Sequence, residues 1–202
     1  MRKNISLYDS LGYIVFMIIA NLAGSVAIIL LMSVVGKSND RELIIKNYKV
    51  FAVLFALVGI VVTTGVMALY FKRKLQNMNL AKCQDNYKAI FKNFCLLALP
   101  GELLRLVLSI IPTKPGNMFG YRLFDGFLAF PPNLIYDWTY VMPNNRLEEI
   151  RKLGYTASDN IIFIVIYLIY FAVIVSVLFF VFLLIWRNLE KAYKNEIKIR
   201  MD

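Results

Sequence analysis

The sequence contains no histidine and only two cysteines, Cys83 and Cys95, among its 202 residues. Histidine is the most frequent general base and metal ligand in enzymes. Its absence excludes the histidine-rich zinc site of intramembrane metalloproteases and the serine–histidine pair of most hydrolases. Two cysteines are too few for a usual zinc site, and we interpret them as small apolar side chains on the reduced side of a membrane. We therefore expect no metal and no cofactor.

Charged residues are also scarce, at 18% of the chain, whereas 59% of the residues are hydrophobic. Soluble domains contain about 45–50% apolar residues, so this composition excludes a water-soluble core. The chain also has no glycine-rich phosphate loop and no internal repeat. The first absence excludes the common nucleotide-binding loop, and the second removes the usual sign of an inverted-repeat transporter.

Long apolar runs dominate the chain, at residues 11–35, 50–71, 94–111 and 161–186. Each reaches or exceeds the roughly 18–20 residues that a helix needs to cross about 30 Å of hydrocarbon. The residues that remain are too few for a separate globular domain. The runs predict an all-α integral membrane protein, formed by residues 1–202 as a single domain with four transmembrane helices. We expect residues 187–202 to form a cytoplasmic helical tail.

The distribution of basic residues predicts the orientation. Four crossings place both termini, and the link between the second and third runs, on one side of the membrane. Thirteen lysines and arginines lie on that side and nine on the other. Because cytoplasmic flanks carry the excess of basic residues, we predict that both termini are cytoplasmic.

The net charge of +10 is explained by the same pattern. Basic residues that flank membrane spans contact anionic headgroups, and here no recognisable nucleic-acid-binding fold accompanies them. We therefore expect membrane lipids as partners, with anionic headgroups at the cytoplasmic face, and no nucleic acid.

Small residues cluster near the middle of the first two runs. Ala20 and Gly24 form a small-x-x-x-small pair in the first run, and Gly59 and Thr63 belong to a similar set in the second. Because the link between these runs is short, the two helices are antiparallel neighbours, and we predict that the two patches pack together. Asn21 lies in the first patch, where an interhelical hydrogen bond is favoured over a ligand contact.

The third run is unusual because it contains Pro100, Gly101, Glu102 and Arg105. Pro100 removes a backbone donor and Gly101 loosens the turn, so we expect a kink or a break here. Glu102 lies about 12 Å into the hydrocarbon, where an unpaired charge is costly. Glu102 and Arg105 are three residues apart on a helix, which favours a structural ion pair. The alternative is a re-entrant helix whose charged residues line a polar cavity.

Two further segments have sequence patterns that predict how they lie at the membrane surface. Residues 80–94 place apolar side chains on one helical face, the pattern of an interfacial helix on the cytoplasmic surface. Residues 112–160 are rich in aromatic residues and proline, and we expect a long loop that folds back on the outer membrane surface. Asp125 and Asp137 in this loop are candidates for a carboxylate site, although solvated acids are the favoured interpretation.

The leading functional hypothesis is a non-enzymatic subunit or accessory factor of a membrane complex, which uses its helix faces, the Glu102–Arg105 site and the aromatic loop as contacts. The alternative is a small oligomeric permease or channel whose polar path passes Glu102, Arg105 and Asn21. A weaker alternative is a lipid-modifying enzyme at the outer interface, using Asp125, Asp137 or Glu102. The first hypothesis predicts a partner membrane subunit, and the second predicts a homo-oligomer.

Overall fold

The computed structural model describes residues 5–37, 48–77, 87–110 and 156–201. These residues form four α-helices: α1 (Leu7–Lys37), α3 (Tyr48–Gln76), α4 (Tyr87–Ile110) and α8 (Ala157–Met201). The described part of the chain is therefore all-helical.

Three of these helices are long and apolar enough to cross a membrane, with candidate spans at Tyr8–Leu31, Ala56–Gln76 and Ala157–Asn195 among the described residues. Their outward surfaces remain apolar, with exposed side chains such as Val15, Ile19, Val61, Leu69 and Ile169. A soluble protein rarely exposes so much apolar surface without a partner, whereas acyl chains cover it at no cost. These features indicate an integral membrane protein.

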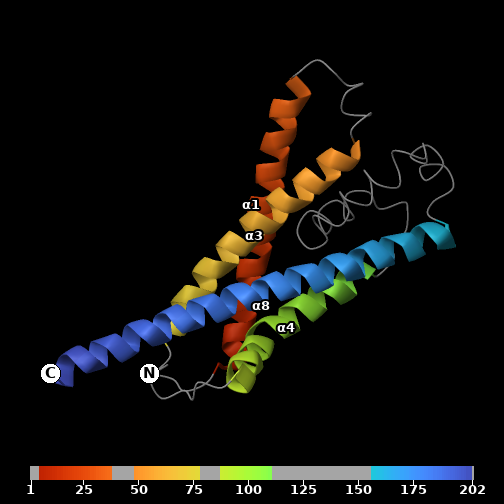
Figure 1. Cartoon of the computed structure of the whole chain (residues 1–202). Coiled ribbons are helices and arrows are strands. Elements are labelled where there is room, and N and C mark those ends of the chain that lie inside the picture. The colour runs from red at the N-terminus through yellow and green to blue at the C-terminus, as the bar shows by residue number, and fades with distance from the viewer. Residues whose placement is uncertain (1–4, 38–47, 78–86, 111–155, 202) are drawn as a thin grey trace.

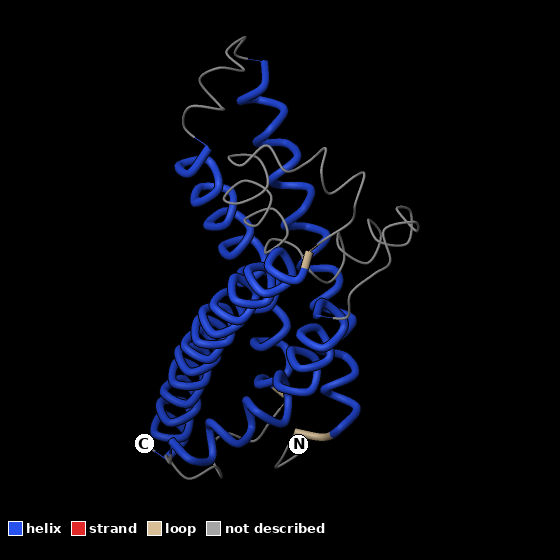
Figure 2. Tube along the Cα trace, turned by 90° about the vertical axis from the view of Figure 1, so that its right-hand side faces the viewer, coloured by secondary structure: helices blue, strands red, loops and turns tan. Residues whose placement is uncertain are grey.

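Each helix packs mainly against two others, in the cyclic order α1, α3, α8, α4. The start of α1, the end of α3, the start of α4 and the end of α8 lie at the same end of the bundle (Figures 1 and 2). Toward the opposite end α1 and α3 diverge from α4 and α8 (Figure 1). The core therefore occupies the part of the bundle where all four helices meet.

Aromatic rings from all four helices meet in this core. Phe71 of α3 packs edge to face against Phe182 of α8, with 5.3 Å between ring centroids, and Phe94 of α4 lies 5.6 Å from Phe182. Tyr13 of α1 stacks on Phe71 at 6.1 Å. Aromatic pairs at these separations contribute about 0.5–1.5 kcal/mol each beyond their burial. This aromatic cluster fixes how the helices cross and brings Tyr13 to the centre of the bundle.

The end of the bundle that holds the start of α1 is strongly basic, and we call it the basic end. Its exposed cations come from α3, α4 and α8: Lys72, Arg73, Lys88, Lys92, Arg187, Lys191 and Lys194. A clamp joins α1 to α3 at this end, because Lys74 contacts Asp9 at 2.9 Å and the Tyr70 hydroxyl donates to the Asp9 carbonyl.

The third helix differs from the sequence-based prediction. α4 begins at Tyr87, so residues 87–94 are the first turns of a bundle helix and not part of a separate interfacial helix. The reason is that Ile90 and Phe94 are buried in the core. The helical conformation expected for the tail is confirmed, because α8 continues without interruption to Met201 and has 45 residues, or about 67 Å.

Two local details concern the start of α8 and the middle of α4. α8 is capped by Thr156, whose backbone N–H donates to the Asp159 carboxylate at 2.7 Å, while its hydroxyl oxygen accepts from the Asp159 N–H at 3.3 Å. The sequence predicted a kink or a break at Pro100 and Gly101, and the break is absent because α4 continues through both residues. The continuity of α4 depends on the Ser10 hydroxyl of α1, which donates to the Leu96 carbonyl.

Candidate functional site

The candidate site is built on an ion pair within α4. The Arg105 Nη2 atom lies 2.8 Å from the Glu102 Oε2 atom, and both side chains are only 1% exposed. The residues are one helical turn apart, so the same stretch of backbone positions both charges. Removing one member of such a buried pair costs about 3–5 kcal/mol, because the other charge is left without compensation.

Tyr13 of α1 completes the surroundings of the carboxylate. Its hydroxyl donates a hydrogen bond of 2.7 Å to the Glu102 Oε1 atom, across 89 residues of sequence. Tyr13 is fully buried. Each oxygen of Glu102 therefore has a partner within the bundle, one from α1 and one from α4.

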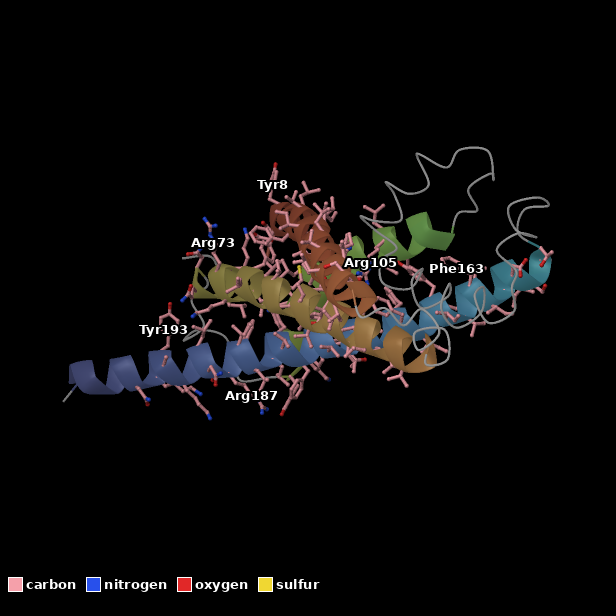
Figure 3. All side chains as sticks on the ribbon, turned by 90° about the horizontal axis from the view of Figure 1, so that it is seen from above. Tyr8, Arg73, Arg105, Phe163, Arg187 and Tyr193 are labelled. Carbon is pink, nitrogen blue, oxygen red and sulfur yellow. The ribbon has the colours of Figure 1, made fainter. Side chains whose placement is uncertain are left out.

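The arginine is enclosed by tyrosines of α8. The Arg105 Cζ atom lies 5.8 Å from the centroid of the Tyr170 ring, within the range of a cation–π contact. Tyr167, one turn earlier on α8, is fully buried. Figure 3 shows Arg105 near the place where α1 and α4 come together, and its side chain is buried. The site thus joins α1, α4 and α8.

Gly101 allows α1 to approach α4 this closely. A Cβ atom at this position would lie 2.7 Å from Cδ1 and 3.0 Å from Cε1 of Tyr13, and 3.2 Å from Cγ1 of Ile14. The side chain of any other residue would push α1 away and lengthen the hydrogen bond from Tyr13 to Glu102. The role of Gly101 is close packing within a continuous helix.

A hydroxyl of α1 accounts for the continuity of α4 at Pro100. Proline has no N–H, so in a helix the carbonyl four residues earlier, here that of Leu96, lacks its usual donor. The Ser10 hydroxyl donates to this Leu96 carbonyl from α1. A substitute donor of this kind keeps the carbonyl hydrogen-bonded where the helix has no N–H of its own to offer.

The small-residue patches of α1 and α3 face each other. A Cβ on Gly24 would lie 3.2 Å from the Thr63 Oγ1 atom and 3.6 Å from the Gly59 carbonyl oxygen. Ala20, one turn from Gly24, is fully buried. Asn21 is also fully buried, about 12 Å along α1 from Tyr13. The structure thus brings Gly24, Gly59 and Thr63 together, and buries Asn21 on the helix that supplies Tyr13.

The sequence reasoning missed Ser10, Tyr13 and Tyr170. A signal was available for Tyr170, because tyrosine prefers the headgroup zone and this residue lies well inside the run 161–186. Tyr13 is the third residue of the run 11–35, a position where tyrosine is ordinary. No comparable signal marked Ser10.

Among the residues that the structure describes, no three His, Cys, Asp or Glu side chains lie together in a way that could hold a metal ion. Asp125 and Asp137 lie outside the described residues, as do residues 111–155 as a whole. No protein family model, curated protein or solved structure matches the chain.

Proposed function

We propose that this chain is a four-span membrane protein that serves as a non-catalytic subunit or accessory factor of a larger membrane complex. The observation that carries the proposal is the enclosure of Glu102 and Arg105. Both charges are turned inward, and both oxygens of the carboxylate are taken up by Tyr13 and Arg105. In this arrangement the loss of either charge is costly, and the mutually neutralised pair offers little charge to a substrate.

The fourth crossing in this proposal is α4. Its 24 residues measure about 36 Å, enough to cross about 30 Å of hydrocarbon. The mutual neutralisation of Glu102 and Arg105 lowers the cost of placing them there. Support also comes from its neighbours, because α4 runs alongside α1 from the Ser10–Leu96 contact to the Tyr13–Glu102 contact.

The basic end is proposed to face the cytoplasm, since basic flanks remain on that side. A reporter enzyme fused after Asp202 tests the orientation. Activity of a cytoplasm-dependent reporter supports it, and a reporter active only outside the cell contradicts it.

The accessory role is tested by purifying the full chain through an affinity tag in a gentle detergent, followed by mass spectrometry. We expect a foreign membrane protein at a fixed ratio to this chain. An unrelated tagged four-span protein prepared in the same way identifies non-specific companions. Recovery of this chain alone, as a homo-oligomer, contradicts the proposal.

A permease is the second candidate, favoured by the burial of Asn21 in addition to Glu102 and Arg105. Three strongly polar side chains inside one small bundle are unusual unless they serve packing or a polar path. Flux through proteoliposomes decides between these roles. A flux that disappears in a folded Glu102→Gln variant establishes transport, whereas a Glu102→Gln variant that assembles and behaves like the parent removes the support for a functional charge.

A further inference from the structure

The basic end carries more charge than its acids neutralise. The acids whose side chains are described there, Asp9 and Glu190, are already paired with Lys74 and Lys194. The exposed cations that remain on α3, α4 and α8 produce a positive surface at one level of the bundle. Such a surface attracts anionic groups. The exposed cations on it differ in how well their surroundings orient them to bind an anion.

One position on this surface is organised by contact between two helices. We call the contact of Tyr87 and Phe91 on α4 with Phe179 and Arg187 on α8 the seam. Here the Arg187 Cζ atom lies 5.0 Å from the centroid of the Tyr87 ring. The Arg187 Nη2 atom also donates to the Tyr87 hydroxyl. Both residues are exposed, so Tyr87 fixes the guanidinium while leaving other N–H donors directed to the surroundings.

A second cation lies beside the first. Lys191 is exposed and follows Arg187 by four residues, on the same face of α8. Figure 3 shows Arg187 on the side of α8 opposite to Tyr193, so this face is turned away from the contact of Tyr193 with the end of α3. The seam therefore presents a planar guanidinium and an ammonium group one turn apart, a combination that suits a phosphate.

Apolar surface continues the seam toward the middle of the bundle. Phe91 lies one turn beyond Tyr87 on α4 and is 55% exposed. It packs edge to face against Phe179 of α8, with 5.5 Å between centroids. Phe91 lies about 6 Å beyond Tyr87 along α4, and Phe179 lies about 12 Å before Arg187 along α8, so aromatic surface follows the cationic group on both helices. The ligand that matches this order is amphiphilic, with a negative head and a hydrocarbon tail.

We propose that the α4–α8 seam binds one anionic phospholipid, with the phosphate on Arg187 and Lys191 and an acyl chain along Phe91 and Phe179. The proposal rests on insertion of the chain in a bilayer, and not on its role as an accessory subunit. A failure here and a failure to find a partner protein are therefore distinguishable.

The test is native mass spectrometry of the purified full chain, after reconstitution with equal amounts of phosphatidylglycerol and phosphatidylcholine. We expect the parent to retain one phosphatidylglycerol per chain in preference to phosphatidylcholine. The variants Arg187→Gln and Lys191→Gln are each expected to bind it about fivefold more weakly. Lys72→Gln, which removes an exposed cation of α3 away from the seam, is the matched control and should retain the lipid as the parent does.

Two results would overturn the proposal. If Arg187→Gln and Lys191→Gln both retained phosphatidylglycerol as the parent does, the seam would not be the binding site. An equal loss in Lys72→Gln would show diffuse attraction to the basic end in place of a defined site. Circular dichroism verifies that each variant is folded, and Lys191→Gln keeps the test valid if loss of the Tyr87 contact unfolds Arg187→Gln.

Discussion

The Ser10 hydroxyl on α1 donates its hydrogen bond to the Leu96 carbonyl on α4, the backbone group that Pro100 leaves without its helical donor. One helix thus supplies a hydrogen bond that another cannot make for itself. The two residues are 86 positions apart, so the substitution depends on the assembled bundle. This relationship explains why a proline inside the third apolar run does not end the helix.

Replacing Ser10 by alanine should destabilise the bundle by about 0.5–1.5 kcal/mol, because the part-buried hydrogen bond to the Leu96 carbonyl is lost. The cost should be much smaller in a Pro100→Ala background, where residue 100 regains an N–H for the same carbonyl. The parent, Ser10→Ala, Pro100→Ala and the double variant are unfolded by titration with a denaturing detergent and followed by circular dichroism, which measures both costs. Equal costs in the two backgrounds would show that Ser10 and Pro100 are not linked.

Replacing Glu102 by glutamine should cost about 3–5 kcal/mol of stability, because Arg105 then remains buried without a counter-charge. Arg105→Gln should have an effect of similar size, because the Glu102 carboxylate then remains buried without its positive partner. The double variant should cost less than the sum of the single variants, by about 0.5–3 kcal/mol. The same unfolding measurement gives this coupling energy, and strict additivity would argue against the ion pair.

Replacing Tyr13 by phenylalanine keeps the ring in the aromatic cluster and removes only the donor to Glu102. We expect a loss of about 1.5–3 kcal/mol, the usual range for a hydrogen bond to a charged group. Tyr8 on the same helix is 81% exposed, so Tyr8→Phe is the matched control and should change stability by less than about 0.5 kcal/mol. Similar results for both variants would contradict the role given to the Tyr13 hydroxyl.

Replacing Gly101 by alanine should weaken the bundle, because the new methyl group would lie 2.7 Å from the Tyr13 ring. Overpacking of this kind costs about 1–3 kcal/mol. Gly65 on α3 has no atom within 4 Å of the corresponding position. Gly65→Ala should therefore be neutral, or stabilising by up to about 1 kcal/mol from the better helix propensity of alanine. If both variants lost stability equally, close packing at Gly101 would not be the cause.

Local sequence patterns predict much of this structure. The length of the apolar runs predicts helices, since few other structures satisfy so many backbone groups in an apolar setting. The i, i+3 spacing predicts that Glu102 and Arg105 lie side by side, because one turn of helix determines their separation. The small residues around Gly24 and Gly59 predict a close approach of two helices for an equally local reason.

The remainder of the site depends on which helices meet, and local patterns do not specify that. Tyr13 and Glu102 are 89 residues apart, and their contact exists only because α1 packs against α4. Pro100 was interpreted as a breaking point, since its effect was judged within α4 alone and the hydroxyl of Ser10 belongs to another helix. The start of α4 was placed too late because lysines at 88 and 92 obscure the burial of Ile90 and Phe94.

The distribution of the site over α1, α4 and α8 has a consequence for biogenesis. The ribosome produces α1 first, so Ser10 and Tyr13 already exist when α4 is synthesised. Glu102 and Arg105 belong to the same helix, so the two charges are able to neutralise each other as soon as α4 forms. Tyr170 belongs to α8, which is synthesised last, so the contact between Arg105 and the Tyr170 ring is the last part of the site that is able to form.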